Sequence, residues 1–199
     1  MKLQIEEMCQ RIEKLLTEKE QVIIVVEGSS ASGKTTLAEM LEKRYEANVF
    51  HMDDFFLQPY QRTRERLEEA GGNVDRERFM TEVLTPLTNN CDIQYRRYDC
   101  KTKTILEAIE MKVKKLNIVE GSYGMHQEFG KYYDLAVFLD ISGELQKERI
   151  LKRNTPEMAE RFLKEWIPME RKYQEAMEIR EKCDFVINVE ENRKVKIRE

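Results

Sequence analysis

Short apolar runs alternate with amphipathic segments along most of this chain. Unbroken apolar runs are typical of strands covered on both faces, and they predict strands at residues 21–27, 48–52, 116–119, 135–139 and 185–187. Apolar residues at helical spacing predict helices at residues 34–45, 144–154 and 158–183. Strands that alternate with helices form parallel units. We therefore expect an α/β fold of three layers, with a mainly parallel sheet flanked by helices.

The start of the chain predicts a separate amphipathic helix. Its apolar positions recur at helical spacing with charged residues between them, at Leu3, Ile5, Met8, Ile12, Leu15 and Leu16. We expect this helix, residues 1–20, to pack against one domain over residues 21–199, because a chain of 199 residues can bury one sizeable core.

The middle of the chain has a less regular pattern. Residues 57–88 are polar and helical in parts, with Gly71 and Gly72 as a break. Residues 93–98 predict a short strand, and residues 105–115 fit either a helix or a hairpin.

Composition narrows the class of protein. The formal net charge is −4, which argues against binding to nucleic acid or to an anionic membrane. No apolar run approaches the roughly 18 residues of a membrane span, and the N-terminus lacks a secretory pattern, so we expect a cytoplasmic protein. The four cysteines form no C-x-x-C pair, and neither they nor His51 and His126 are assigned any chemistry.

The clearest motif is the sequence GSSASGKTT at residues 28–36, between a predicted strand and a predicted helix. It matches G-x-x-x-x-G-K-[ST], in which backbone N–H groups and the helix N-terminus converge on a polyphosphate. Lys34 would reach the β- and γ-phosphates of ATP, and the Thr35 hydroxyl would ligate Mg²⁺. The candidate ATP-binding residues are Gly28, Ser29, Ser30, Ala31, Ser32, Gly33, Lys34, Thr35 and Thr36.

Acidic residues end three other predicted strands, where ligands of such sheets bind. Asp53 and Asp54 follow one strand, and Glu120 ends another. Asp140 we interpret as structural, because Ser142 looks like the cap of the next helix. Spacing alone does not choose between Asp53 and Asp54.

Basic residues surround a Thr-Pro break at residues 149–161, namely Arg149, Lys152, Arg153 and Arg161. Such spacing is common on a solvated helix face. It also fits a small lid whose arginines close over ATP and neutralise the transferred phosphoryl group. The N-K-x-D motif of GTPases and the Asp-Glu pair of ATPase motors are absent, so group transfer is favoured.

Four segments together resemble one known family. GSSASGKTTLA, HMDDFF, IVEG and WIPMERKYQEA resemble, in this order, segments of the uridine kinase and nicotinamide riboside kinase branch of the P-loop kinases. The similarity runs from about residue 22 to residue 187, and HMDDFF and the Trp-x-Pro-Met stretch are closer to nicotinamide riboside kinase. The resemblance implies Mg²⁺-dependent transfer of phosphate from ATP to the 5′-hydroxyl of a nucleoside, as in nucleoside salvage.

The resemblance also implies roles for individual residues. It chooses Asp53 over Asp54 as the base, places Asp75 on the ribose hydroxyls, and joins Glu120 to Thr35 around Mg²⁺. One departure concerns the nucleobase. Uridine kinases have a Tyr-Asp-Phe segment followed shortly by histidine, whereas residues 98–103 here read YDCKTK. Tyr98 remains a candidate substrate contact, and the identity of the base is left open.

The expected protein is thus an ATP-dependent kinase acting on a small-molecule acceptor, with Asp53, Lys34, Arg149 and Arg153 in catalysis. Two alternatives stay open. One is a P-loop module that binds or slowly hydrolyses ATP to switch a partner, with the N-terminal helix as its docking surface. The other is a related small-metabolite kinase, such as pantothenate kinase or phosphoribulokinase. The sequence does not choose between a monomer and a homo-oligomer.

Overall fold

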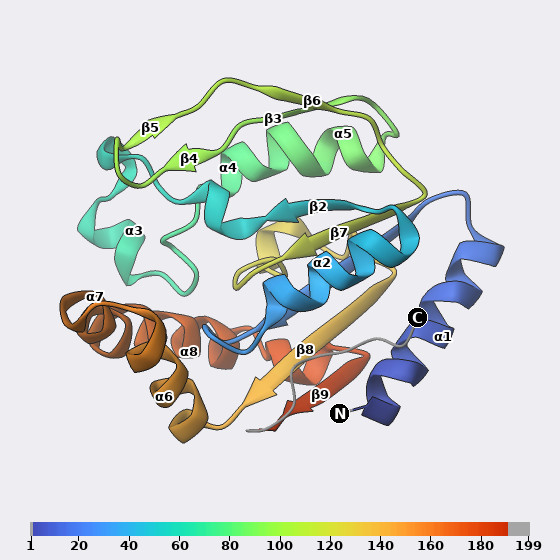
Figure 1. The fold of residues 1–199 in the computed structure, drawn as a ribbon. Coiled ribbons are helices and arrows are strands. Elements are labelled where there is room, and N and C mark those ends of the chain that lie inside the picture. Colours follow the sequence, from blue (N-terminus) through green and yellow to red (C-terminus); the bar gives the residue numbers. More distant parts are fainter. Residues whose placement is uncertain (1, 191–199) are drawn as a thin grey trace.

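A five-stranded parallel sheet forms the centre of the protein (Figure 1). The computed structural model describes residues 2–190, so residues 191–199 of the predicted domain lie outside the described residues. The strand order is β2-β7-β1-β8-β9, and every neighbouring pair is parallel. The strands are β1 (Val22–Gly28), β2 (Asn48–His51), β7 (Leu116–Glu120), β8 (Leu135–Ile141) and β9 (Phe185–Val189). The predicted parallel α/β fold is confirmed.

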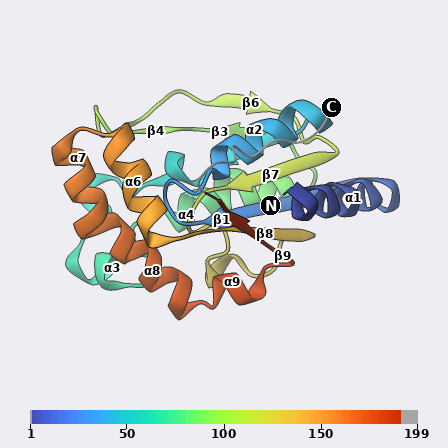
Figure 2. The same cartoon turned by 60° about the horizontal axis from the view of Figure 1, so that its bottom comes forward.

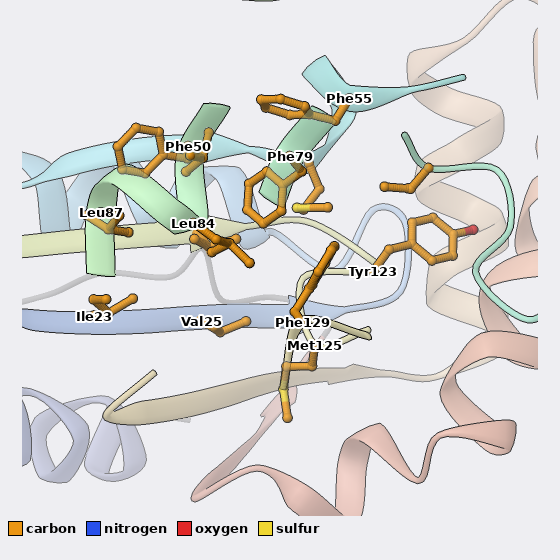
Figure 3. Packing of buried hydrophobic residues seen from close by; sticks show 14 of the residues in the cluster. Ile23, Val25, Phe50, Phe55, Phe79, Leu84, Leu87, Tyr123, Met125 and Phe129 are labelled. Atoms are coloured by element: carbon orange, nitrogen blue, oxygen red, sulfur yellow. The ribbon is translucent and has the colours of Figure 1, made fainter. Parts of the chain in front are cut away.

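The two faces of the sheet are covered by different helices, which makes three layers. The described helices are α1 (Lys2–Glu18), α2 (Lys34–Tyr45), α3 (Arg64–Glu68), α4 (Arg76–Phe79), α5 (Thr85–Thr88), α6 (Gly143–Arg153), α7 (Pro156–Arg161), α8 (Ile167–Ala176) and α9 (Ile179–Lys182). Alternate residues of β1 point to opposite faces because a strand has a period of two. Ile24 packs with α1 and α2, whereas Ile23 and Val25 pack with Phe50 and Phe79 on the other face (Figure 3).

The N-terminal helix α1 buries its apolar face in the core. Ile5, Met8, Ile12 and Leu15 all belong to the cluster that α2 also joins. The apolar side of α1 is therefore covered by this domain, except at Leu3, which is 67 % exposed. In Figures 1 and 2, α1 lies at the opposite end of the molecule from α6 and α7.

Residues 93–115 form two small antiparallel pairs of strands. They are β3 (Ile93–Tyr95) with β6 (Ile109–Met111), and β4 (Tyr98–Asp99) with β5 (Thr104–Ile105). Both alternatives for residues 105–115 are wrong, because Ile105 ends β5, which pairs with β4, and β6 pairs with β3 instead of forming a hairpin of its own. The stretch IEMKV alternates with a period of two, so Met111 and Val113 both pack against the second core cluster.

The predicted helix over residues 158–183 is broken into shorter pieces. A π-helical turn at Phe162–Trp166 separates α7 from α8, and Glu178 has a left-handed backbone (φ 50°) that separates α8 from α9. Among residues 2–190, no helix combines the length and the apolar character that crossing a bilayer requires.

Candidate active site

The phosphate loop connects β1 to α2 through three left-handed or otherwise positive φ values. Gly28 has φ 138°, Ala31 has φ 64° and Gly33 has φ 103°. A Cβ atom on Gly28 would lie 2.5 Å from the backbone oxygen of Leu139 in β8. The first glycine of the motif is thus required by both backbone conformation and close packing against the neighbouring strand.

Polar side chains from α6 and α8 hold this loop in place. The Glu170 carboxylate accepts hydrogen bonds from Ser30 N at 2.9 Å and from Ser30 Oγ at 2.5 Å. From α6, Gln146 Nε2 donates to Ser30 O at 3.1 Å, and Arg149 Nη1 donates to Ala31 O at 3.0 Å. The loop is therefore fixed by α8 and by α6, whose last residues, from Arg149 on, belong to the predicted lid.

The loop has the features that a polyphosphate requires. Its backbone leads into the N-terminus of α2, where helix N–H groups have no partner within the helix. The Ser32 hydroxyl is buried and has no hydrogen-bond partner among the described residues. Lys34 lines the same cleft and donates from Nζ to Ser29 O at 3.1 Å. These residues fit the phosphates of ATP.

Thr35 and Glu120 meet beside the loop and form a pair of oxygen donors. Thr35 Oγ1 donates to Glu120 Oε1 at 3.2 Å, and His51 Nδ1 lies 2.5 Å from the same oxygen. No cluster of three or more His, Cys, Asp or Glu suited to a metal occurs in the described part of the chain. Two protein oxygens nevertheless fit Mg²⁺ at a kinase site, because this ion takes most of its other ligands from phosphates and water.

His51 is a neighbour of this pair that the sequence analysis left without a role. Its hydrogen bond to Glu120 raises the pKa of the imidazole, and burial opposes that effect. The parallel register pairs His51 of β2 directly with Glu120 of β7. The sequence shows that His51 ends a predicted strand, but its contact with Glu120 could be predicted only if β2 were known to lie beside β7.

The structure separates the two adjacent aspartates. Asp53 opens onto the cleft, and among the described residues no hydrogen bond or ion pair engages its carboxylate. Asp54 Oδ2 instead accepts a hydrogen bond from Tyr95 OH at 2.5 Å and does not line the cleft. Removal of bulk water by the cleft walls raises the pKa of Asp53, Lys34 lowers it, and the nearby carboxylates raise it further.

The cleft has a volume of about 1740 Å³. Its walls contain Ser30 to Thr36 of the loop together with Asp53, Tyr98, Glu120, Arg149 and Arg153. Figure 1 shows α6 and α7 beside the N-terminal end of α2, on the side to which β8 points. Gly28 and Ser29 belong to the loop but do not line the cleft. Most of the predicted site residues are thus brought into one cavity.

Asp75 is not brought into that cavity. It is 2 % exposed, caps the start of α4, and accepts hydrogen bonds from Arg78 N at 3.1 Å and Arg78 Nε at 3.4 Å. Asn73, two residues earlier, does line the cleft, and its Oδ1 atom is buried without a hydrogen-bond partner among residues 2–190. The geometry therefore offers Asn73, which the motif did not single out, as a contact for an acceptor hydroxyl.

A buried carboxylate supports the loop from behind. Glu27 is 0 % exposed, and its Oε1 accepts from Tyr173 OH at 2.7 Å and from Met125 N at 3.1 Å. Burial raises the pKa of Glu27 from its ordinary value of 4.5 to about 7, although these hydrogen bonds oppose the change. Glu27 thus ties the end of β1 to α8.

This pKa makes a specific prediction about stability. The folded state binds the proton of Glu27 more tightly than the unfolded state does. The protonated carboxyl therefore contributes its full stabilisation of the fold below pH 4.5, and this contribution is lost as the pH rises to about 7. Relative to Glu27→Gln, the free energy of unfolding of the wild type should fall across this window by up to about 3 kcal/mol. Urea unfolding at several pH values measures it, with the exposed Glu175→Gln as the control. Parallel pH profiles for the wild type and Glu27→Gln would contradict the assignment.

A parallel sheet whose central strand runs through a phosphate loop into a helix is the arrangement of the P-loop nucleotide-binding proteins. The profile of the phosphoribulokinase / uridine kinase family matches residues 23–161, and the chain belongs to this family. It is therefore a kinase of that family, which uses ATP.

Solved structures support the fold. A possible uridine kinase from Bacillus stearothermophilus superposes with a TM-score of 0.64 at 22% identity, covering 91% of this chain and 99% of that one. A protein provisionally assigned as a fructose transport system kinase, from Silicibacter sp. TM1040, gives 0.69 at 18% identity, with coverages of 94% and 98%. YFH7 from Saccharomyces cerevisiae, provisionally assigned as a circularly permuted P-loop kinase, gives 0.60 at 15%, with coverages of 92% and 97%. No curated protein sequence matches the chain.

Proposed function

We propose that this protein transfers the γ-phosphoryl group of Mg-ATP to the 5′-hydroxyl of a nucleoside, or to the primary hydroxyl of a similar sugar-bearing metabolite. The observation that carries the proposal is the unengaged Asp53 carboxylate in the cleft that Lys34 and the phosphate loop also line. A carboxylate in this position can accept the proton of a hydroxyl as it attacks phosphorus.

Each group of residues has a distinct task in this proposal. The loop N–H groups and Lys34 bind the phosphates. Thr35 and Glu120 would hold Mg²⁺, which would supply positive charge beside the phosphoryl group. Arg149 and Arg153, at the edge of the cleft, exclude water and add positive charge. His51 orients the Glu120 carboxylate through its 2.5 Å contact.

A second candidate is a related small-metabolite kinase, of the pantothenate kinase or phosphoribulokinase type. The position of Asp75 favours this candidate. A nucleoside kinase was expected to bind the ribose through Asp75, but Asp75 is buried against Arg78 outside the cleft. The P-loop switch has less support, because the core covers the apolar face of its proposed docking helix α1 at every position except Leu3.

A panel of acceptors tests the proposal. We expect ADP formation to require an added acceptor when nucleosides, pantothenate and ribulose 5-phosphate are compared. Cys100 and Lys103 line the cleft at the segment with which uridine kinases bind the pyrimidine, so uridine and cytidine should gain no strong preference. The ratios of kcat/KM decide this point. ATP hydrolysis that no acceptor accelerates would support the switch, and a uridine preference above about 100-fold would show that other residues bind the pyrimidine.

A further inference from the structure

The charge of the cleft is opposite to that of the protein. The chain has a net charge of −4, yet the cleft is lined by nine cationic side chains and four carboxylates. The cations are Lys34, Arg62, Lys101, Lys103, Arg149, Lys152, Arg153, Arg161 and Lys164. The carboxylates are Asp53, Glu120, Glu165 and Glu170. Positive charge concentrated in a cavity of an acidic protein selects anionic ligands.

Six of these cations stand on the phosphate loop or on the lid segments. The phosphates of ATP would neutralise the charges of Lys34, Arg149, Lys152 and Arg153. The remaining two of the six cations already have acidic partners. Arg161 pairs with Glu165 at 3.5 Å, and Lys164 pairs with Glu160 at 2.5 Å. The lid side therefore needs no further anion beyond the phosphates of ATP.

The other three cations form a separate group, which we call the acceptor wall: Arg62, Lys101 and Lys103. Arg62 follows the 3₁₀ turn Pro59–Gln61, and the two lysines lie in the turn between β4 and β5. Within residues 2–190, no hydrogen bond or ion pair engages any of these three side-chain charges. The nearest acid in sequence, Asp99, accepts from Lys101 N at 2.8 Å and does not line the cleft.

The acceptor wall lies close to the element that carries Asp53, because β4, which precedes the two lysines, packs against the 3₁₀ turn Met52–Phe55. Burial raises the pKa of the Cys100 thiol most, Asp53 and Asp99 raise it further, and Arg62 lowers it. Asp53 and Arg62 therefore both lie near this thiol. Arg62 also acts on the Tyr98 hydroxyl, which lines the same region. Asp53 and Arg62 therefore both border the region of the cleft around Tyr98 and Cys100.

We infer that the acceptor carries, besides the reacting hydroxyl, an anionic group, a phosphate or a carboxylate, and that Arg62 binds it with Lys101 and Lys103. The inference rests on the proposed kinase reaction and narrows its acceptor. The guanidinium of Arg62 can bind either anion through two parallel hydrogen bonds, and the lysines add charge. This class includes sugar phosphates, hydroxy acids and nucleosides with an acidic base.

Binding measurements test this without turnover. With the phosphate loop saturated by a non-hydrolysable Mg-ATP analogue, calorimetry compares ribulose 5-phosphate with ribulose and pantothenate with panthenol. At least one anion should bind about 10- to 100-fold more tightly than its neutral partner, the range of a charge-assisted hydrogen bond. The two pairs distinguish a phosphate from a carboxylate. Charge reversal in Arg62→Glu should remove this preference, Lys103→Ala should reduce it, and the exposed Arg64→Ala should retain it.

Several outcomes would overturn the inference. One is equal binding of both members of each pair, or no anion binding at all. Another is a weaker affinity of Arg62→Glu for the ATP analogue, which would assign the acceptor wall to ATP. The kinase reaction itself is judged separately, by acceptor-dependent ADP formation in the wild type. Rapid phosphorylation of neutral nucleosides, unchanged in Arg62→Glu, would support the kinase reaction and contradict the anionic acceptor.

Discussion

Asp53→Asn is expected to lower the rate of phosphoryl transfer by about 10²–10⁴-fold, the usual contribution of a positioned general base. The substitution keeps the size of the side chain but removes the group that accepts the proton. ATP binding should survive, because the loop and Lys34 are unchanged. The measurement is steady-state turnover with the best acceptor of the panel, together with direct ATP binding.

Asp54→Asn is the matched control for this experiment. Asp54 stands beside Asp53 in the sequence, but its carboxylate accepts a hydrogen bond from Tyr95 and does not line the cleft. It should therefore cost less activity than Asp53→Asn. Full activity in Asp53→Asn would exclude it as the base, and Glu120 and Asp54 would become the candidates.

Lys34→Ala is expected to abolish most of the stabilisation that Mg-ATP confers on the folded protein. A ligand at 100 times its Kd stabilises the folded state by about 2.7 kcal/mol, and loss of the lysine that neutralises the phosphates weakens binding enough to remove most of this. Thermal unfolding with and without Mg-ATP measures the effect as a shift in Tm.

Lys43→Ala provides the control, because Lys43 is exposed in the last turn of the same helix α2. That variant should show the full shift in Tm. If Mg-ATP stabilised Lys34→Ala as much as the wild type, the phosphate assignment of the loop would be wrong.

The phosphate loop and the strand ends could be predicted because their chemistry is local. A glycine is needed where φ is positive, and the acids follow directly from strands whose carboxyl ends share one edge. The structure of residues 105–115 could not be predicted, because short apolar runs fit both a helix and a hairpin. The strand that forms there, β6, depends on pairing with β3, which lies outside the segment.

The missed features depend on contacts between distant segments. Glu170 reaches Ser30, which lies 140 residues earlier, and Glu27 reaches Tyr173 in α8. Nothing local in either stretch reveals these partners. For Asp75 the prediction from the sequence was misleading. Its resemblance to a family motif predicted a contact with the acceptor, but its carboxylate accepts a hydrogen bond from the nearby Arg78 instead.

The hydrogen bonds of Gln146, Arg149 and Glu170 to the phosphate loop make α6, the loop and α8 one rigid frame. The predicted lid covers residues 149–161, and its first residues, 149–153, belong to α6 and so to this frame. Any closing movement is then confined to the segment between α6 and α8, residues 154–166, which contains α7 and the π-helical turn. Hydrogen exchange with Mg-ATP should change most there, and equal changes in α6 would contradict this. The segment would then move as a short flap whose two ends are fixed at α6 and α8. The length of this flap, rather than a rotation of whole helices, would limit the size of the acceptor that it can enclose.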